Sequence, residues 1–241
     1  MEHCAFKLRY HHFNEKSILI AWPKEISKRV LEDINSFKAK IKSSPLNGQV
    51  LQTINAYQSL WVQFKDEIED FNKAVLTLQN LYENTSLTTE HTTKNWKIPV
   101  CYDASFGLDL KTMCTELKVS EAELIKRHCR PLYTVYFIGF LPGFLYLGGL
   151  DKELRFPRKA IPRQKVAAGA VCIGDYQTGV YPNESPGGWN IIGNTPVKLF
   201  DPSKEKPCFA KAGDTLQFYP VDLKKHTEIK ILVQNDVFIN E

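Results

Sequence analysis

The feature that most constrains the fold is a polar stretch, residues 83–95, which separates two halves of different sequence pattern. Before it, strand-like and helix-like segments alternate, whereas after it short apolar runs are interrupted by glycine and proline. A segment whose apolar residues follow neither helical nor strand spacing, and which has several turn-forming residues, is typical of a linker. We therefore predict two domains, residues 1–88 and 89–241, and the chain is long enough for both to have a core.

The first domain is predicted to be a small α/β sandwich. Residues 6–12 and 17–22 are typical of two strands, and residues 26–41 carry apolar side chains at helical spacing. Residues 50–64 are strand-like, and residues 70–82 return to the helical spacing. The order ββαβα favours helices packed on one face of a sheet.

The second domain is predicted to be rich in β-structure. Residues 98–102 are typical of a short strand, and residues 108–128 of one or two helices, with Ser120 and Glu123 as a capping box. From residue 132 onward, the pattern is typical of a β-barrel or sandwich. The whole chain is therefore expected to be α+β.

An uncharged run, residues 132–150, is nearly long enough to span a membrane. Pro142 and the pair Gly148-Gly149 interrupt it, and residues 133–138 are typical of a buried strand. We therefore expect no membrane helix here.

Composition and charge exclude several classes of protein. The net charge of +4, from 31 basic and 27 acidic residues, lacks the concentrated basic patch that nucleic acid needs. The six cysteines form no CxxC pair, so we expect reduced thiols, and no signal peptide is visible; both favour a cytoplasmic protein. His11 and His12 are adjacent and would point to opposite faces of a strand, so no metal site is predicted. No phosphate-binding loop or dinucleotide fingerprint is present.

Three clusters in the second half carry more glycine, proline and polar residues than packing requires. The first, residues 139–149, is dense in glycine, which lets backbone approach a ligand or form a tight loop around aromatic core residues. In the second, Arg158 and Arg163 each follow a proline, so each guanidinium is either placed to bind a carboxylate or phosphate or is simply solvated. The candidate ligand contacts of the first cluster are Phe140, Pro142 and Gly143.

The third cluster, residues 177–189, combines amide, hydroxyl and glycine groups. Such a set is suited to holding an amide and a developing oxyanion, although a turn-rich connection between strands would have the same composition. His128, at the end of a predicted helix, is either a proton carrier or a capping residue. The candidate residues of the third cluster are Gln177, Thr178, Tyr181, Glu184, Ser185, Gly187 and Gly188.

At these clusters the sequence resembles the KipI family, which includes allophanate hydrolase subunit 1 and the B subunit of ATP-dependent 5-oxoprolinase. The matching stretches are GFLPGFLYLGGL, PRKAIPRQKVAAGAV, QTGVYPNESPGGWNIIGNTP, LFDPS and AGDTLQF, in the order of the family. The resemblance implies an N-terminal α/β domain joined to a cyclophilin-like β-barrel. It also implies a heteromeric complex with the 5-oxoprolinase A and C subunits, the latter KipA-like, which hydrolyses 5-oxo-L-proline to L-glutamate with ATP.

On this resemblance, the candidate residues take specific roles. Arg158 and Arg163 would bind the substrate carboxylate or the transferred phosphate, and Gln177 with the Gly187 and Gly188 amides would orient the lactam. His128 would be the catalytic proton carrier.

The same family carries two alternative functions. One is a KipI-like inhibitor of a sensor histidine kinase, and the other is an accessory subunit of a urea carboxylase or allophanate hydrolase system. The sequence departs from the family pattern at a few positions, which leaves the substrate open. These positions are Leu141, Leu145, Ala167 and Asn194.

Overall fold

The computed structural model describes residues 6–84 and 93–235, and it divides the chain into two compact units, Met1–Thr92 and Thr93–Glu241. The predicted boundary between residues 88 and 89 lies outside the described residues. Each unit has its own apolar core.

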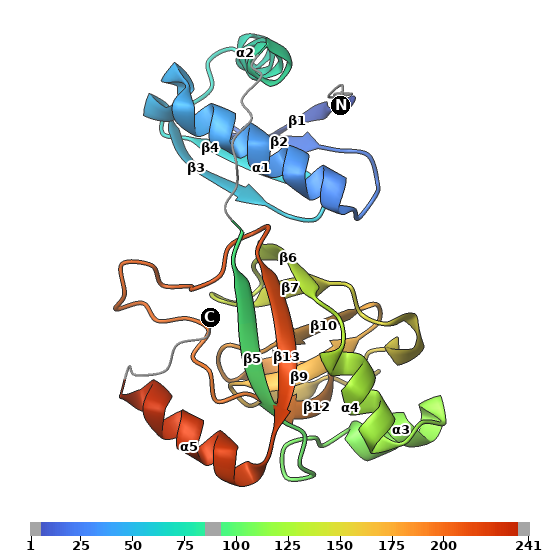
Figure 1. Cartoon of the computed structure of the whole chain (residues 1–241). Helices are drawn as coiled ribbons and strands as arrows, with labels where there is room; N and C mark the ends of the chain where they lie inside the picture. Colours follow the sequence, from blue (N-terminus) through green and yellow to red (C-terminus); the bar gives the residue numbers. More distant parts are fainter. Residues whose placement is uncertain (1–5, 85–92, 236–241) are drawn as a thin grey trace. The chain divides into compact units, whose positions relative to one another are not determined.

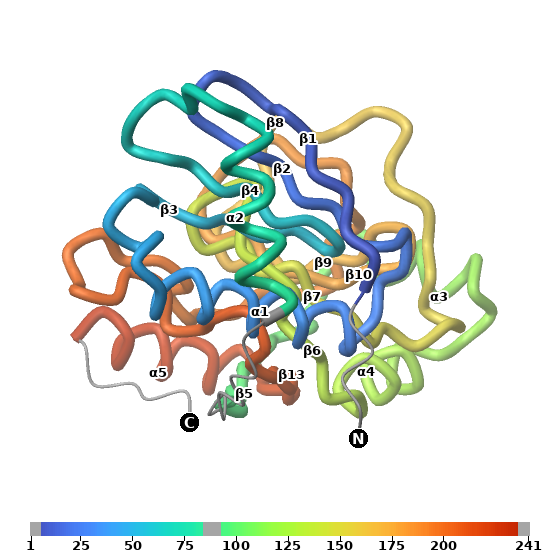
Figure 2. The backbone as a smooth tube through the Cα atoms, turned by 90° about the horizontal axis from the view of Figure 1, so that it is seen from above, coloured from blue at the N-terminus to red at the C-terminus, as the bar shows by residue number. Residues whose placement is uncertain are grey.

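The N-terminal unit is a four-stranded antiparallel sheet covered on one face by two helices (Figures 1 and 2). The strands lie in the order β1-β2-β4-β3. Ile18 and Ile20 of β2 pair with Val62 and Leu60 of β4, and all four are fully buried beneath the helices. The elements are β1 (Arg9–Asn14), β2 (Ser17–Ala21), α1 (Lys28–Ser43), the 3-10 helix η1 (Pro45–Gly48), β3 (Val50–Asn55), β4 (Ser59–Phe64) and α2 (Phe71–Asn84).

The predicted single strand over residues 50–64 is wrong, because this segment is the β3–β4 hairpin and the order is ββαββα. The Ala56 N–H donates to the Ser59 carbonyl oxygen at 2.9 Å and closes the turn. No glycine or proline marks this turn, and strand-forming residues resume directly after it, so the sequence pattern reads as one continuous strand.

The C-terminal unit is a closed barrel of seven strands in the order β10-β7-β6-β13-β5-β12-β9. β5 and β13 run parallel to each other and lie side by side (Figure 1). The barrel strands are β5 (Asn95–Cys101), β6 (Tyr133–Ile138), β7 (Leu145–Gly148), β9 (Ala170–Gly174), β10 (Gln177–Val180), β12 (Asn190–Asn194) and β13 (Thr215–Val221). The remaining elements are α3 (Leu110–Leu117), α4 (Glu121–Cys129), the 3-10 helix η2 (Lys152–Leu154), β8 (Arg163–Val166), β11 (Ser185–Gly187) and α5 (Leu223–Gln234).

The barrel confirms the predicted α+β class and the β-rich second half. Residues 108–128 form two helices, and the Ser120 hydroxyl accepts from the Glu123 N–H at 3.1 Å, as expected for a cap. The uncharged run holds β6 and β7, and no helix among the described residues is long and apolar enough to cross a membrane. α5 was missed by the sequence prediction.

Alternating side chains on the barrel strands make two apolar clusters. Val171 and Ile173 of β9 point into the barrel core, whereas Ala170 and Cys172 belong to a second cluster on the outer side. The β8–β11 ribbon contributes Val166 to this second cluster. Phe144, Tyr181 and Trp189, from two of the glycine-rich motifs, also belong to this second cluster.

Candidate functional site

The three sequence clusters come together on the outer side of β9, β10 and β12. The ring of Phe144 lies 5.4 Å from that of Tyr181 and 5.6 Å from that of Trp189, in edge-to-face contacts. The guanidinium carbon of Arg158 lies 5.5 Å from the centre of the Trp189 ring. We call Phe144, Arg158, Tyr181 and Trp189 the outer cluster.

Arg158 is the charged member of the outer cluster. Its side chain is 52% exposed, and its Nε donates to Asp175 Oδ2 at 2.8 Å. A guanidinium that rests on an aromatic face and remains half-exposed can still bind an anion arriving from solvent. Burial is the main reason that the pKa of Tyr181 rises to about 12, so this hydroxyl stays protonated beside the arginine.

A close contact with β11 holds the loop that carries Arg158. The Lys159 N–H donates to the Gly188 carbonyl oxygen at 2.7 Å, and Arg163 pairs with Gly187 across the β8–β11 ribbon. A Cβ on Gly187 would lie 2.3 Å from the Tyr181 hydroxyl oxygen, so only glycine allows this packing. Gly187 therefore serves close packing here.

Arg163 differs from Arg158 although both follow a proline. Its Nη2 donates to Asp109 Oδ1 at 2.8 Å, and the Lys159 Nζ donates to the same oxygen at 2.8 Å. The side chain of Arg163 is 25% exposed, and its Nη1 is buried without a hydrogen-bond partner among the described residues. Arg163 is thus already engaged by a carboxylate of its own chain.

Asp109 was not predicted as a site residue. Burial alone raises the pKa of Asp109, but hydrogen bonds from Arg163, Lys159 and the Ile191 N–H outweigh it, so the carboxyl pKa lies below its usual value. The residues that bond to the Asp109 side chain lie 50 to 82 positions later in the sequence. Only the position of Asp109 directly before α3 distinguishes it in the sequence.

Thr178 lies on the inner side of β10, away from the outer cluster, and the side chain of His128, in the last turn of α4, reaches it there. His128 is fully buried, its Nδ1 lies 2.7 Å from the Tyr102 hydroxyl, and its Nε2 lies 2.8 Å from Thr178 Oγ1. Burial lowers the pKa of His128 to about 3. This geometry favours a structural role for His128 and Thr178 over the predicted catalytic and binding roles.

Gln177 lies on the same side of β10 as the outer cluster. Successive residues of a strand face opposite sides, so Gln177 and Gly179 face away from the buried Thr178. A Cβ on Gly179 would lie 3.1 Å from Trp189 Cζ3 and 3.2 Å from Phe144 Cζ, which confirms that this side is the outer one. Gln177 Nε2 is buried without a hydrogen-bond partner in the described part of the chain.

The remaining predicted residues lie at the edges of the outer cluster. Phe140 is 66% exposed with φ of +65°, and its ring is 5.7 Å from that of Phe144. Pro142 is exposed, and Gly143 is buried next to Phe200. Glu184 is exposed and pairs with Lys165 at 3.3 Å, while Ser185 is buried in the β8–β11 ribbon.

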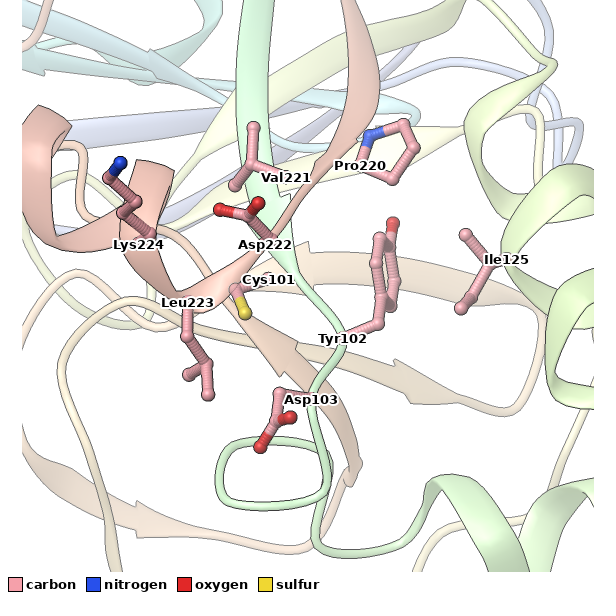
Figure 3. A pocket seen from close by; sticks show the side chains of 9 residues that line it. All are labelled: Cys101, Tyr102, Asp103, Ile125, Pro220, Val221, Asp222, Leu223 and Lys224. Atoms are coloured by element: carbon pink, nitrogen blue, oxygen red, sulfur yellow. The ribbon is translucent and has the colours of Figure 1, made fainter.

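A pocket of about 500 Å³ lies elsewhere in the unit, between the ends of β5 and β13 and the start of α5 (Figure 3). None of the predicted site residues lines it. Its two carboxylates already cap backbone N–H groups: Asp222 accepts from Lys225 N at 2.7 Å, and Asp103 accepts from Ser105 N at 2.9 Å. These caps explain both acidic residues without a ligand.

The chain is similar to proteins of known family over most of its length. The family described as carboxyltransferase domain, subdomain C and D, matches residues 8–210. The chain is 34% identical to the 5-oxoprolinase B subunit of Bacillus subtilis, with 90% of this chain and 94% of that protein covered. It is 35% identical to the 5-oxoprolinase B subunit of Haemophilus influenzae, with 85% and 94% covered.

Solved structures share the fold. The crystal structure of TTHA0988 matches with a TM-score of 0.73 and 30% identity, over 86% of this chain and 40% of that longer chain. Urea amidolyase of Kluyveromyces lactis matches with a TM-score of 0.79 over 98% of this chain and 16% of that chain, at 17% identity, which shows the fold alone. The family resemblance drawn from the sequence motifs is confirmed, and the chain belongs to the carboxyltransferase-domain family, subdomains C and D, together with proteins named as the B subunit of 5-oxoprolinase.

Proposed function

We propose that this chain is the B subunit of an ATP-dependent 5-oxoprolinase, which hydrolyses 5-oxo-L-proline to L-glutamate together with partner subunits in the cytoplasm. The similarity to proteins named as 5-oxoprolinase B subunits extends over both units of the chain. The observation that carries the proposal is that the three motifs converge on one cluster with a half-exposed arginine. The partners are the A and C subunits, the latter KipA-like.

The reaction explains why such a cluster is useful. A five-membered lactam is a poor electrophile, and phosphorylation of its amide oxygen by ATP, with release of ADP, makes the ring carbon more electrophilic. Water then attacks this carbon and the ring C–N bond breaks to free the amine, and a second water hydrolyses the remaining acyl phosphate to the carboxylate and phosphate. In this chain, Arg158 would bind the substrate carboxylate or the transferred phosphate through charge-assisted hydrogen bonds. Gln177, whose Nε2 lacks a partner within the described residues, would orient the lactam amide.

The geometry reassigns several predicted roles within this proposal. Both arginines pair with a carboxylate, but the Arg163–Asp109 pair is 25% and 6% exposed whereas the Arg158–Asp175 pair is 52% and 43% exposed, so Arg158 is the better anion-binding residue. Phe140 and Pro142, which are exposed, would border the bound substrate, whereas the buried His128 and Thr178 maintain the barrel. ATP is used by the complex, and no phosphate-binding motif assigns its binding to this chain.

The test is glutamate formation from 5-oxoproline and ATP by this chain co-purified with the products of its neighbouring genes. Activity should disappear when this chain alone is omitted. An intact complex that forms no glutamate would contradict the proposal, and bicarbonate-dependent ATP hydrolysis stimulated by urea would then indicate the carboxylase alternative.

The site assignment has its own variant and control. Arg158→Ala should lower turnover of the intact complex by about 100-fold, as is typical for loss of one transition-state contact. Arg130→Ala is the matched control, because Arg130 is 71% exposed and pairs with Asp151 at 3.1 Å away from the outer cluster. Unchanged turnover in Arg158→Ala would remove Arg158 from the site.

A further inference from the structure

The buried carboxylate of Asp109 accepts hydrogen bonds from three donors, which come from two separate segments of the chain. Its Oδ1 accepts from Lys159 Nζ and Arg163 Nη2, both at 2.8 Å, and its Oδ2 accepts from the Ile191 N–H at 2.7 Å. The residue is 5% exposed. It therefore joins the loop that carries Arg158 to β12.

The backbone fixes Asp109 on β12 independently of the two cations. The Asp109 N–H donates to the Ile191 carbonyl oxygen at 2.8 Å, which completes a two-way contact with the same residue. A Cβ on Gly107 would lie 2.7 Å from the Ile192 carbonyl oxygen, so the segment before Asp109 lies tightly against the strand. β12 thus sets the position of the carboxylate, and the carboxylate sets the position of the cations.

Lys159 and Arg163 lie near the two ends of the loop that carries Arg158 and leads into β8. Lys159 directly follows Arg158, and its backbone N–H also bonds to Gly188, next to Trp189. Arg163 begins β8, where the loop ends. The geometry points to Asp109 as a positioning residue that holds this loop so that the Arg158 guanidinium lies over Trp189, an inference that rests on the proposed function.

Loss of the carboxylate would release the loop through charge repulsion. The Lys159 and Arg163 side chains are only 31% and 25% exposed, and both of their donors meet at one oxygen. Without the anion, two partly buried positive charges would face each other unpaired, which is strongly unfavourable. Since Asp109 bonds to Lys159, Arg163 and Ile191 and Arg158 bonds to Asp175, the effect of Asp109 on the substrate would be exerted through the loop.

The test compares Asp109→Asn with Asp214→Asn in the complete complex. Asp214 is a matched control, because it is 1% exposed and accepts from the Trp96 Nε1, Lys94 N and Lys211 N donors at 2.9–3.0 Å. We expect Asp109→Asn to raise the KM for 5-oxoproline about 10-fold with the KM for ATP unchanged, a smaller effect than the roughly 100-fold loss that a misplacement of about 1 Å can cause. Asp214→Asn should leave both KM values unchanged.

A second variant covers the case in which Asp109→Asn does not fold. Lys159→Met keeps the Asp109–Arg163 pair and removes one of the two anchors of the loop, so it should raise the same KM by a smaller factor. An unchanged KM for 5-oxoproline in both variants, or an equal rise in Asp214→Asn, would overturn the inference.

Hydrogen exchange of the chain alone separates this inference from the proposed function. The Lys159 and Ile191 amides should exchange at least 10-fold faster in Asp109→Asn than in the wild type and in Asp214→Asn. If the wild-type complex forms no glutamate but exchange changes in this way, the proposed function fails and the positioning of the loop stands. Equal protection in all three proteins would overturn the positioning role.

Discussion

Acidification should destabilise the C-terminal unit through His128, because its two ring nitrogens make hydrogen bonds that only the neutral imidazole can make together. The Thr178 hydroxyl donates its single proton to the Cys172 carbonyl oxygen at 3.0 Å, so it accepts from His128 Nε2 at 2.8 Å. Nδ1 is then the acceptor for the Tyr102 hydroxyl at 2.7 Å. The ring is also stacked on Phe218, with 4.6 Å between the ring centres.

The magnitude follows from the pKa difference between the folded and unfolded states. Burial lowers the pKa of His128 from 6.5 to about 3. The folded pKa is below the unfolded one, so the stability is complete above about pH 6.5 and is lost as the pH falls below that value. Each pH unit below 6.5 costs about 1.4 kcal/mol, so a change from pH 7.5 to pH 5 should cost about 2 kcal/mol. A loss of this size is a large part of the usual 5–15 kcal/mol stability of a domain.

The assay is urea unfolding of the full chain at pH 7.5 and pH 5, for the wild type and for His128→Gln, which does not titrate. The free energy of unfolding should fall by about 2 kcal/mol more in the wild type than in the variant over this range. The other histidines, including His226, contribute equally to the pH dependence of both proteins, so their effects cancel in the comparison. The same pH dependence in both proteins would refute the reasoning and would reopen the possibility that His128 carries protons in the reaction.

Three further changes test local packing. Gly143→Ala should destabilise the protein by about 3 kcal/mol in urea unfolding, because φ is +86° and the new Cβ would lie 2.6 Å from the Phe200 Cβ. Gly149→Ala, with φ of +111° and no atom beyond its chain neighbours closer than 3.7 Å to the new Cβ, should cost only about 1 kcal/mol, and equal costs would contradict the steric argument. Ser120→Ala should cost about 1 kcal/mol through loss of the α4 cap, and an unchanged Tm would show that this cap is not needed.

The sequence predicted most of the fold because its patterns are local. Helical spacing located α1, α2, α3 and α4, and the glycine- and proline-punctuated apolar runs indicated a barrel. The β3–β4 turn was missed because it lacks glycine and proline, and α5 was missed because no single apolar face distinguishes it. Both errors arise where the local chemistry that usually marks a boundary is absent.

The candidate site was predicted only in part because its decisive contacts are distant in sequence. The composition of the glycine-rich motifs singled them out, since it is typical of backbone that packs closely, but it did not predict that they lie together. The faces of β10 were separable in principle, because Gln177 and Thr178 are neighbours in a strand and point to opposite sides. Asp109 gave no comparable signal, since no local sequence pattern predicts that its carboxylate binds Arg163, 54 residues later in the chain.

The two arginines of the loop show how burial separates residues that the sequence pattern treats alike. Arg163 satisfies a buried carboxylate, so Arg163→Ala should lower the free energy of unfolding by about 2 kcal/mol. Arg158 forms an ion pair whose members are 52% and 43% exposed, and such pairs contribute little, so Arg158→Ala should change stability by less than about 0.5 kcal/mol. Urea unfolding of both variants, combined with turnover of their complexes, would separate the roles. If Arg158→Ala proved the more destabilising of the two, the half-exposed guanidinium would be a packing residue, and the anion site assigned to it would have to lie elsewhere.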